Sequence, residues 1–286
     1  MKKIAIIFNP TSGSGKRDKL NQIISRLEKN HQITLFETSG PGDATDIARR
    51  ECDHFDIIVA AGGDGTINEV VNGLKVGSTL GIIPLGTANI MAIEAGIKTD
   101  IHSICSVLEN GNIKKIYIPH INQKKFCLMA GIGYDGDIVH HMNPSLKKTF
   151  GKAMFGFLGF VEFLKSKKYK IKVETDNETY FGNWVLATKA KHYAGPYKIS
   201  QTTSIFENNL ICYVFKNLTR LNFLYYLFLI LFYGDLSKSK DIITLSSKHI
   251  KITSDESVNI QCDGEKFSRL PADIKFEGEY INLVTL

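Results

Sequence analysis

Apolar and polar positions alternate with two different periods along the first third of the chain. Short apolar runs read as buried strands of a parallel sheet, at residues 4–8, 33–36, 56–61 and 80–84. The segments that follow these runs have apolar residues at helical spacing, at residues 19–28, 45–51, 67–74 and 90–95. This alternation predicts an open α/β domain over residues 1–118, with ligands at the carboxyl ends of its strands.

Past residue 118 the pattern changes to short segments rich in β-forming residues, separated by turn-forming pairs such as Asp263-Gly264. The segments are residues 170–174, 184–188, 210–215, 250–254, 258–262 and 280–285. They predict a second, β-rich domain over residues 119–286. Two apolar stretches interrupt it, at residues 150–164 and at the uncharged residues 221–234. Both are shorter than the roughly 20 residues of a membrane-spanning helix, so they are either buried helices or surfaces that touch lipid.

The composition indicates the class of protein and the cellular compartment. Hydrophobic residues make up 43% and charged residues 22% of the chain, as in ordinary globular proteins. The five cysteines are widely spaced and include no C-x-x-C pair. They fit neither a disulfide framework nor a zinc site and favour a reducing, cytoplasmic compartment. The apolar run at residues 4–8 is too short for a signal peptide.

The net charge of +6 is unevenly placed. Residues 1–118 contain 13 basic and 13 acidic side chains, whereas the remainder contains 22 basic and 16 acidic ones. Residues 147–172 hold eight lysines and one acid, Glu162, and they include the aromatic stretch 150–164. Lysines beside aromatic residues can bind an anionic membrane, although the same pattern also describes core helices with solvated lysines at their ends.

The strongest chemical signal is the loop Gly62-Gly63-Asp64-Gly65-Thr66, between a buried strand and a helix. Glycine allows close backbone approach, and the amides and dipole at a helix start favour an anion there. Asp64 has no evident structural duty in this loop. Beside polyphosphate its carboxylate would be repelled unless it organised Mg²⁺ or took a proton from an attacking hydroxyl. The alternative is a tight turn in which Asp64 and Thr66 cap the helix.

Two similar loops follow other strands. The first, Asn9-Pro10-Thr11-Ser12-Gly13, leads towards Lys16 without satisfying the P-loop spacing, and the other is Pro84-Leu85-Gly86-Thr87-Ala88-Asn89. Thr87 and Asn89 can donate to phosphate or cap the next helix. Three such turns on adjacent strand ends predict one phosphate-binding crevice. Nucleic-acid binding would explain the lysines but not these loops, so we exclude it.

Together these motifs resemble the diacylglycerol kinase catalytic-domain family, in particular bacterial soluble lipid kinases that are also similar to sphingosine kinases. The motifs occur in the family's order over almost the whole chain: residues 9–13, Thr38 ahead of Gly42-Asp43-Ala44, residues 62–69, residues 84–89 and Asp263-Gly264-Glu265. The resemblance implies an N-terminal open α/β nucleotide-binding domain and a C-terminal β-sandwich-like domain, with the active site in the cleft between them. It also implies that the last strands can return to the first domain.

The resemblance further implies a set of ATP contacts and three acids. The ATP-contacting positions are Asn9, Pro10, Thr11, Ser12, Gly13, Thr38, Gly62, Gly63, Asp64, Gly65, Thr66, Ile67, Asn68, Glu69, Thr87 and Asn89. Asp263 and Glu265 stand where the family has its proton-accepting acids, although Asp-Gly between β segments is ordinarily a hairpin turn. We expect Glu265 or Asp263 to act as the base and Asp64 to hold Mg²⁺ through water. The reverse assignment, with Asp64 as the base, stays open.

Two positions depart from the family pattern. Ile90 stands where bacterial diacylglycerol kinases have aspartate, which removes one acid from the surroundings of the metal. Members similar to sphingosine kinases also have an apolar residue there, so the change points to altered specificity. Glu207-Asn208-Asn209-Leu210 replaces an Asp-rich metal-binding sequence, and a structural Mg²⁺ site is not expected there.

The sequence therefore predicts an ATP- and Mg²⁺-dependent kinase of a lipid alcohol. We expect it to be cytoplasmic, peripheral at the inner membrane surface, and to bind anionic membrane but no nucleic acid. One alternative is a kinase of a soluble alcohol such as NAD, which the apolar C-terminal segments disfavour. Another is a catalytically inactive lipid-binding regulator, which Ile90 supports and the retention of Asp64, Asp263 and Glu265 opposes. The sequence leaves the oligomeric state open, including a homodimer.

Overall fold

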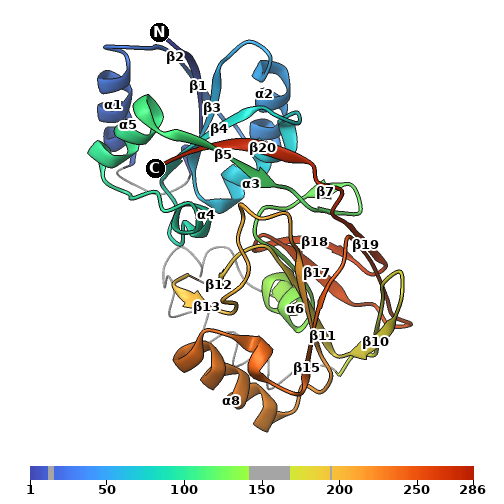
Figure 1. The fold of residues 1–286 in the computed structure, drawn as a ribbon. Helices are drawn as coiled ribbons and strands as arrows, with labels where there is room; N and C mark the ends of the chain where they lie inside the picture. Colours follow the sequence, from blue (N-terminus) through green and yellow to red (C-terminus); the bar gives the residue numbers. More distant parts are fainter. Residues whose placement is uncertain (12–15, 142–167, 194) are drawn as a thin grey trace. The chain divides into compact units, whose positions relative to one another are not determined.

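The computed structural model describes residues 1–11, 16–141, 168–193 and 195–286. The chain divides into two compact units (Figure 1), residues 1–118 with 278–286 and residues 119–277. The carboxyl-terminal residues thus leave the β-rich part of the chain and complete the first unit. Ser12, Gly13, the aromatic stretch 150–164 and most of the lysine-rich stretch lie outside the described residues.

The first unit contains a six-stranded sheet in the order β2-β1-β3-β4-β20-β5, parallel except for the pair β20–β5. Its strands are β1 (Lys3–Phe8), β2 (Gln32–Glu37), β3 (Ile57–Gly62), β4 (Thr79–Pro84), β5 (Asn112–Tyr117) and β20 (Tyr280–Thr285). Its helices are α1 (Lys16–Leu27), α2 (Asp43–Glu51), α3 (Asp64–Gly73), α4 (Ile90–Glu94) and α5 (Ile101–Asn110). All the strands and helices predicted for residues 1–95 are present, with ends shifted by at most three residues.

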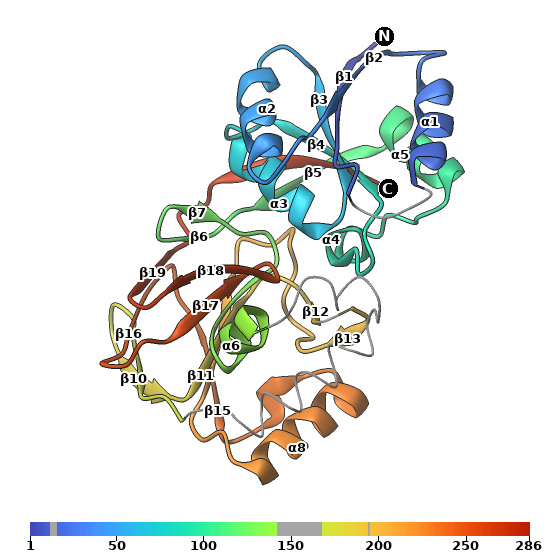
Figure 2. The ribbon, with the colours of Figure 1, turned by 180° about the vertical axis from the view of Figure 1, so that it is seen from behind.

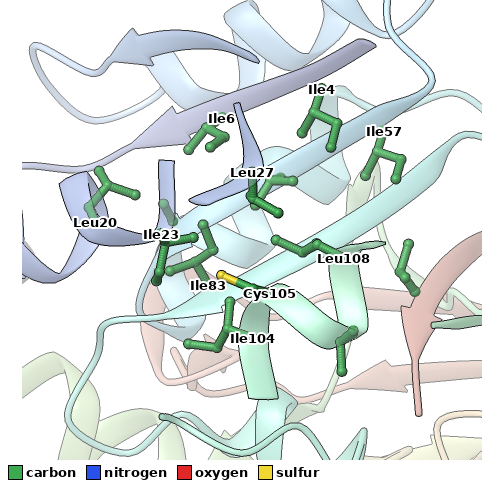
Figure 3. Close-up of a cluster of buried hydrophobic side chains, with 14 of the residues drawn as sticks. Ile4, Ile6, Leu20, Ile23, Leu27, Ile57, Ile83, Ile104, Cys105 and Leu108 are labelled. Carbon is green, nitrogen blue, oxygen red and sulfur yellow. The ribbon is translucent and has the colours of Figure 1, made fainter. Parts of the chain in front are cut away.

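Helices cover both faces of this sheet, α1 and α5 on one side and α2 and α3 on the other (Figures 1 and 2). Figure 3 shows the α1–α5 side, where Ile4 and Ile6 pack with Leu20 and Leu108. On the other side α2 and α3 come so close that a Cβ at Gly73 would lie 2.2 Å from the carbonyl oxygen of Thr45. Burial on both faces explains why these strands read as continuous apolar runs.

The second unit contains two antiparallel six-stranded sheets and is β-sandwich-like. One sheet consists of β10 (Thr179–Gly182), β9 (Ile171–Glu174), β16 (His249–Thr253), β19 (Ala272–Lys275), β6 (His120–Ile121) and β7 (Lys124–Lys125). The other consists of β15 (Ile242–Ser246), β14 (Ile211–Phe215), β11 (Trp184–Thr188), β8 (Met129–Gly133), β17 (Asn259–Cys262) and β18 (Glu265–Arg269). A separate hairpin is formed by β12 (His192–Tyr193) and β13 (Tyr197–Lys198).

Within the described residues of the second unit, the helical elements are α6 (Tyr134–His141), α8 (Arg220–Phe228), the π-helical turn η1 (Leu229–Tyr233) and the 3₁₀ turn η2 (Leu236–Lys238). The uncharged stretch 221–234 therefore forms most of α8 together with η1. No helix within the described part of the chain is long and apolar enough to cross a membrane. All five cysteines are free thiols.

Candidate active site

Three loops of the first unit leave neighbouring parallel strands at one edge of the sheet. Strand β3 lies between β1 and β4, so the loops that follow these strands are neighbours. Thr38, at the end of β2, joins them because its amide donates to the carbonyl of Phe8 at 3.0 Å. The structure thus brings together, at this edge, the described members of the predicted nucleotide site: residues 9–11, Thr38, 62–69, 87 and 89.

Hydrogen bonds tie the three loops to one another. The amide of Asn9 donates to the carbonyl of Ala61 at 3.1 Å, and its side-chain Nδ2 donates to Thr66 Oγ1 at 3.2 Å. The amide of Leu85 donates to the carbonyl of Gly62 at 2.8 Å. The Lys16 ammonium, at the start of α1, donates to the carbonyl of Leu85. The loops therefore form one connected assembly rather than three separate turns.

Glycines allow the loop after β3 and the loop after β4, the second and third of the three loops along the chain, to touch. A Cβ at Gly86 would lie 2.6 Å from the Cα of Gly63, which is closer than real Cβ atoms approach a backbone atom. Asn89 has a left-handed backbone with φ 50°, and its side chain folds back to accept from the Gly86 amide at 2.8 Å. Thr87 is exposed at the tip of the same loop. The two loops therefore meet backbone to backbone at Gly63 and Gly86, a close approach that glycine permits in phosphate-binding loops.

Asp64 has a structural role that the sequence did not reveal. Its two carboxylate oxygens accept from the amides of Ile90 at 3.1 Å and Met91 at 2.9 Å, at the start of α4. The expectation that Asp64 has no structural duty was therefore wrong. The alternative, in which Asp64 and Thr66 cap their own helix, is also not what the structure shows, because Gly63 occupies the N-cap of α3 without a side-chain hydrogen bond. The helix start beside the glycines thus carries no side-chain cap, which suits an anion.

Glu69 and Asn68, on α3, make hydrogen bonds next to this edge of the sheet. The Glu69 carboxylate accepts from the Gly42 amide at 3.1 Å, and its carbonyl accepts from Thr45 Oγ1 at 2.8 Å. Asn68 is buried and accepts from the side chain of Asn72 at 3.2 Å. The two contacts of Glu69 hold the segment after β2 against α3, whereas the contact of Asn68 lies within α3.

The second unit contains the other two predicted acids, on the hairpin between β17 and β18. Asp263 and Gly264 have positive φ of 49° and 81°, so the pair forms the ordinary two-residue hairpin turn. The Asp263 carboxylate accepts from the amides of Cys127, Leu128 and Met129 at 2.7 to 2.9 Å. Glu265 is exposed, and its carboxylate makes no hydrogen bond among the described residues. Asp263 is therefore a backbone anchor, whereas Glu265 presents an accessible carboxylate.

Two further buried acids lie on α6 and were not predicted. Asp135 accepts from Gln261 Nε2 at 2.6 Å and from the hydroxyl of Tyr193. Burial raises the pKa of Asp135, and the hydrogen bonds from Tyr193 and Gln261 oppose that rise. Gln261 also accepts from the Gly264 amide at 2.8 Å, which links Asp135 to the hairpin turn. Asp137 accepts from Tyr169 at 2.9 Å.

A sequence signal for Asp135 was available. Gly131-Ile132-Gly133-Tyr134-Asp135 places glycines at the end of a buried strand and an acid at the start of a helix, the same arrangement as in residues 62–66. A Cβ at Gly131 would lie 1.9 Å from Asp135 Oδ2, so this glycine makes room for the carboxylate.

A buried ammonium occupies the loop where the sequence lacks the Asp-rich pattern. Lys189 is fully buried and donates to the carbonyl oxygens of Glu207 and, at 2.8 Å, Asn209. Burial lowers the pKa of Lys189 to about 8. Two carbonyl oxygens of this loop are thus bound by a side-chain cation.

The described residues contain no ready-made metal site. None of their His, Cys, Asp or Glu side chains form a group of three that could hold a metal ion. The oxygens of Asp64 already accept backbone amides. Mg²⁺ usually keeps several waters and binds one or two carboxylates together with substrate phosphates. The residues present therefore fit a Mg²⁺ that arrives with a nucleotide, and they do not fit a protein-built cage.

Comparison with known proteins identifies the family. Residues 3–121 match the diacylglycerol kinase catalytic domain, and residues 129–285 match the YegS C-terminal NAD kinase beta sandwich-like domain. A diacylglycerol kinase of Bacillus subtilis is 30% identical over 292 residues, covering 99% of this chain and 94% of that protein. The chain belongs to the diacylglycerol kinase catalytic-domain family. It is therefore a member of a family of kinases, as the motifs indicated.

Other relatives agree in family and fold. A diacylglycerol kinase of Staphylococcus saprophyticus is 29% identical, over 99% of this chain and 93% of that protein. The crystal structure of a putative diacylglycerol kinase from Bacillus anthracis superposes with a TM-score of 0.84 at 23% identity, over 99% of this chain and 95% of the other. An NAD kinase from Archaeoglobus fulgidus in complex with ATP gives 0.56 at 13% identity, over 99% and 93%. At these identities the two structures show the shared fold.

Proposed function

We propose that this kinase uses ATP to phosphorylate the hydroxyl of a lipid alcohol, such as a diacylglycerol-like or sphingoid-like molecule. The observation that carries ATP binding is the edge of the first unit, where three connected loops meet and Gly63 touches Gly86. Backbone amides and an uncapped helix start at such an edge bind phosphate well. The assembly extends over the ends of three neighbouring strands, so it can contact more than one phosphate group of a nucleotide.

The proposed reaction is an in-line phosphoryl transfer. The acceptor hydroxyl oxygen forms a bond to the γ-phosphorus of ATP, while the bond between that phosphorus and the oxygen bridging to the β-phosphate breaks. ADP leaves with the bridging oxygen. The hydroxyl proton passes to a carboxylate of the protein, so the transfer needs no other reactant.

Glu265 is the proposed proton acceptor. It is accessible, whereas the oxygens of Asp263 already receive three backbone amides and those of Asp64 receive two. A carboxylate whose oxygens are committed to fixed donors is a poor base, because the donors favour its anionic form. Asp64 organises the second and third loops, and in this proposal it also contacts water around a nucleotide-borne Mg²⁺. The metal would neutralise charge on the phosphate oxygens.

Two features support a lipid rather than a soluble acceptor. The B. subtilis relative is named a diacylglycerol kinase and matches over nearly its full length. The second unit carries seven exposed large apolar side chains on α8 and η1.

The test is an assay with γ-labelled ATP, Mg²⁺ and either a total lipid extract or NAD, followed by identification of the labelled product. The proposal predicts label in a lipid phosphate. Label in NADP would show a soluble acceptor instead. ATP binding without transfer to any lipid would favour the inactive regulator and contradict the proposal.

A further inference from the structure

One face of α8 and η1 is apolar and open to solvent. Seven large side chains on these elements are between 43% and 79% exposed: Leu221, Leu224, Tyr225, Phe228, Leu231, Phe232 and Tyr233. We call these seven residues the outer apolar face. They follow helical spacing along one side, so they form a continuous stripe rather than scattered positions. Figures 1 and 2 both show α8 at one end of the second unit, away from β18 and β19.

The opposite side of the same helix is firmly packed. Phe223, Tyr226 and Leu229 are buried, and the first two lie against an aromatic cluster around Trp184. Trp184 stacks on Phe215 with ring centroids 3.8 Å apart, and Phe215 meets Tyr226 at 5.1 Å. From Phe223 to Tyr233 the helical stretch is therefore apolar on all sides yet held in place on one of them. A helix that is apolar all round normally lies in a protein interior or in lipid.

Cations outnumber acids by four to two in the sequence that contains and flanks the outer apolar face, residues 216–241, where the acids are Asp235 and the exposed Asp241. No charged residue occurs between Leu221 and Gly234. Exposed cations flank this stretch in sequence, at Lys216, Arg220, Lys238 and Lys240. The Lys238 ammonium lies 4.3 Å from the centre of the Tyr233 ring. The nearest acid, Asp235, is half-buried and its carboxylate caps η2 by accepting from the Ser237 amide at 3.0 Å.

We propose that the outer apolar face lies in the surface of an anionic lipid bilayer, with the flanking cations at the level of the head groups. Apolar aromatic and leucine side chains with basic residues at the margin are typical of helices that lie in a membrane surface. A symmetric contact with a second copy of this chain would instead bring the same cations towards each other, which is unfavourable. The inference rests on the proposed lipid acceptor for its purpose, since such docking would bring the enzyme to its substrate.

The first test is co-sedimentation of the full chain with vesicles of equimolar phosphatidylcholine and phosphatidylglycerol. We expect the double variant Phe228→Ser/Phe232→Ser to bind the vesicles about 10-fold more weakly or worse, because two inserted rings are lost. The matched control is Phe181→Ser, since Phe181 is 65% exposed on β10 and lies outside α8 and η1. Equal binding by the double variant and the wild type would overturn the proposal, as would equal losses in both variants.

A second test measures insertion directly. Trp184 is the single tryptophan of the chain, and its indole N–H has no hydrogen-bond partner among the described residues, so Trp184→Phe removes it without breaking such a bond. In that background, Phe232→Trp places a fluorophore on the outer apolar face. Brominated lipid acyl chains should quench its emission and should not quench Phe181→Trp in the same background. Equal quenching at the two positions, or none at 232, would contradict insertion.

Two further measurements separate this inference from its alternatives. Sedimentation velocity without lipid that shows a dimer abolished by Phe228→Ser/Phe232→Ser would assign the face to a second copy and overturn the proposal. Kinase activity on a short-chain acceptor dissolved in buffer should be the same in the double variant and the wild type. Vesicle binding without activity on any lipid would refute the proposed function while leaving the docking face intact.

Discussion

The aspartates of the two glycine-containing turns make an instructive comparison between the two units. Asp64 in the first unit and Asp263 in the second are both part of family motifs. The carboxylate oxygens of each accept hydrogen bonds from backbone amides of a separate segment. Around Asp64 lie backbone-lined loops that suit phosphate, whereas beside Asp263 stands the exposed Glu265. An aspartate in a family motif can thus have a structural role, in which it holds backbone amides in place. The proton acceptor is better sought among acids whose oxygens are not already committed.

The largest effect is expected from Glu265→Gln. Loss of a general base typically reduces turnover by about 100-fold to 10,000-fold. Because Glu265 is exposed, stability and ATP affinity should be unchanged. Single-turnover kinetics with saturating ATP and lipid measure the effect, with thermal unfolding as the control. Near-normal turnover in this variant would contradict Glu265 as the base and favour Asp64 as the proton acceptor.

Asp263→Ala should act mainly on stability. It leaves the three buried amides of residues 127–129, which lead into β8, without this acceptor, and this should lower the free energy of unfolding by about 2 to 5 kcal/mol. Denaturant unfolding measures this loss. Glu265→Gln, two residues away, is the matched control and should change it by less than about 0.5 kcal/mol. Equal stability of the two variants would show that Asp263 is not an anchor.

Gly86→Ala should weaken ATP binding. The added Cβ would lie 2.6 Å from the Cα of Gly63, so the second and third loops must separate. We expect the Kd for ATP to rise about 10-fold to 100-fold, because separating the loops costs about one to three kcal/mol of binding free energy. Isothermal titration calorimetry checks the value. Gly264→Ala is the control, because its added Cβ would meet no atom within 4 Å and the strain at its positive φ of 81° falls on the hairpin turn of the second unit, so ATP should bind normally.

The smallest effect is a pH dependence from Lys189. Burial lowers the pKa of Lys189 from 10.5 to about 8, so the folded chain binds fewer protons than the unfolded chain between these values. The contribution of Lys189 to stability must therefore rise as pH rises through this window. The free energy of unfolding of the wild type, minus that of Lys189→Met, should increase by about 1 to 3 kcal/mol from pH 7.5 to 10. A difference that stays flat or falls would contradict the buried ammonium.

Much of the first unit could be predicted because its signals are local. Strands buried on both faces gave continuous apolar runs, and the glycine turns at their ends marked the edge where the loops meet. Strand β5 was not predicted because, among the described strands, it pairs with β20 alone, near the other end of the chain, and residues 112–115 are exposed. Its polar sequence carries no strand period to detect.

The roles of single acids could not be predicted because their partners are distant in sequence. Asp263 accepts from amides more than 130 positions earlier, and Asp64 accepts from a helix start 26 positions later. Neither contact leaves a trace in the local pattern. Asp135 is different, since its strand–glycine–helix setting repeats that of Asp64 and was readable in the sequence.

Hydrogen–deuterium exchange of the full chain, with and without ATP and Mg²⁺, tests the central claim most directly. The claim is that backbone-rich loops of the first unit hold the nucleotide phosphates. ATP should slow exchange in residues 9–11, 62–67 and 84–90 together, and at an ATP concentration near the wild-type Kd Gly86→Ala should show most of this protection lost. Protection confined to other segments of the chain, or none at saturating ATP, would contradict the account.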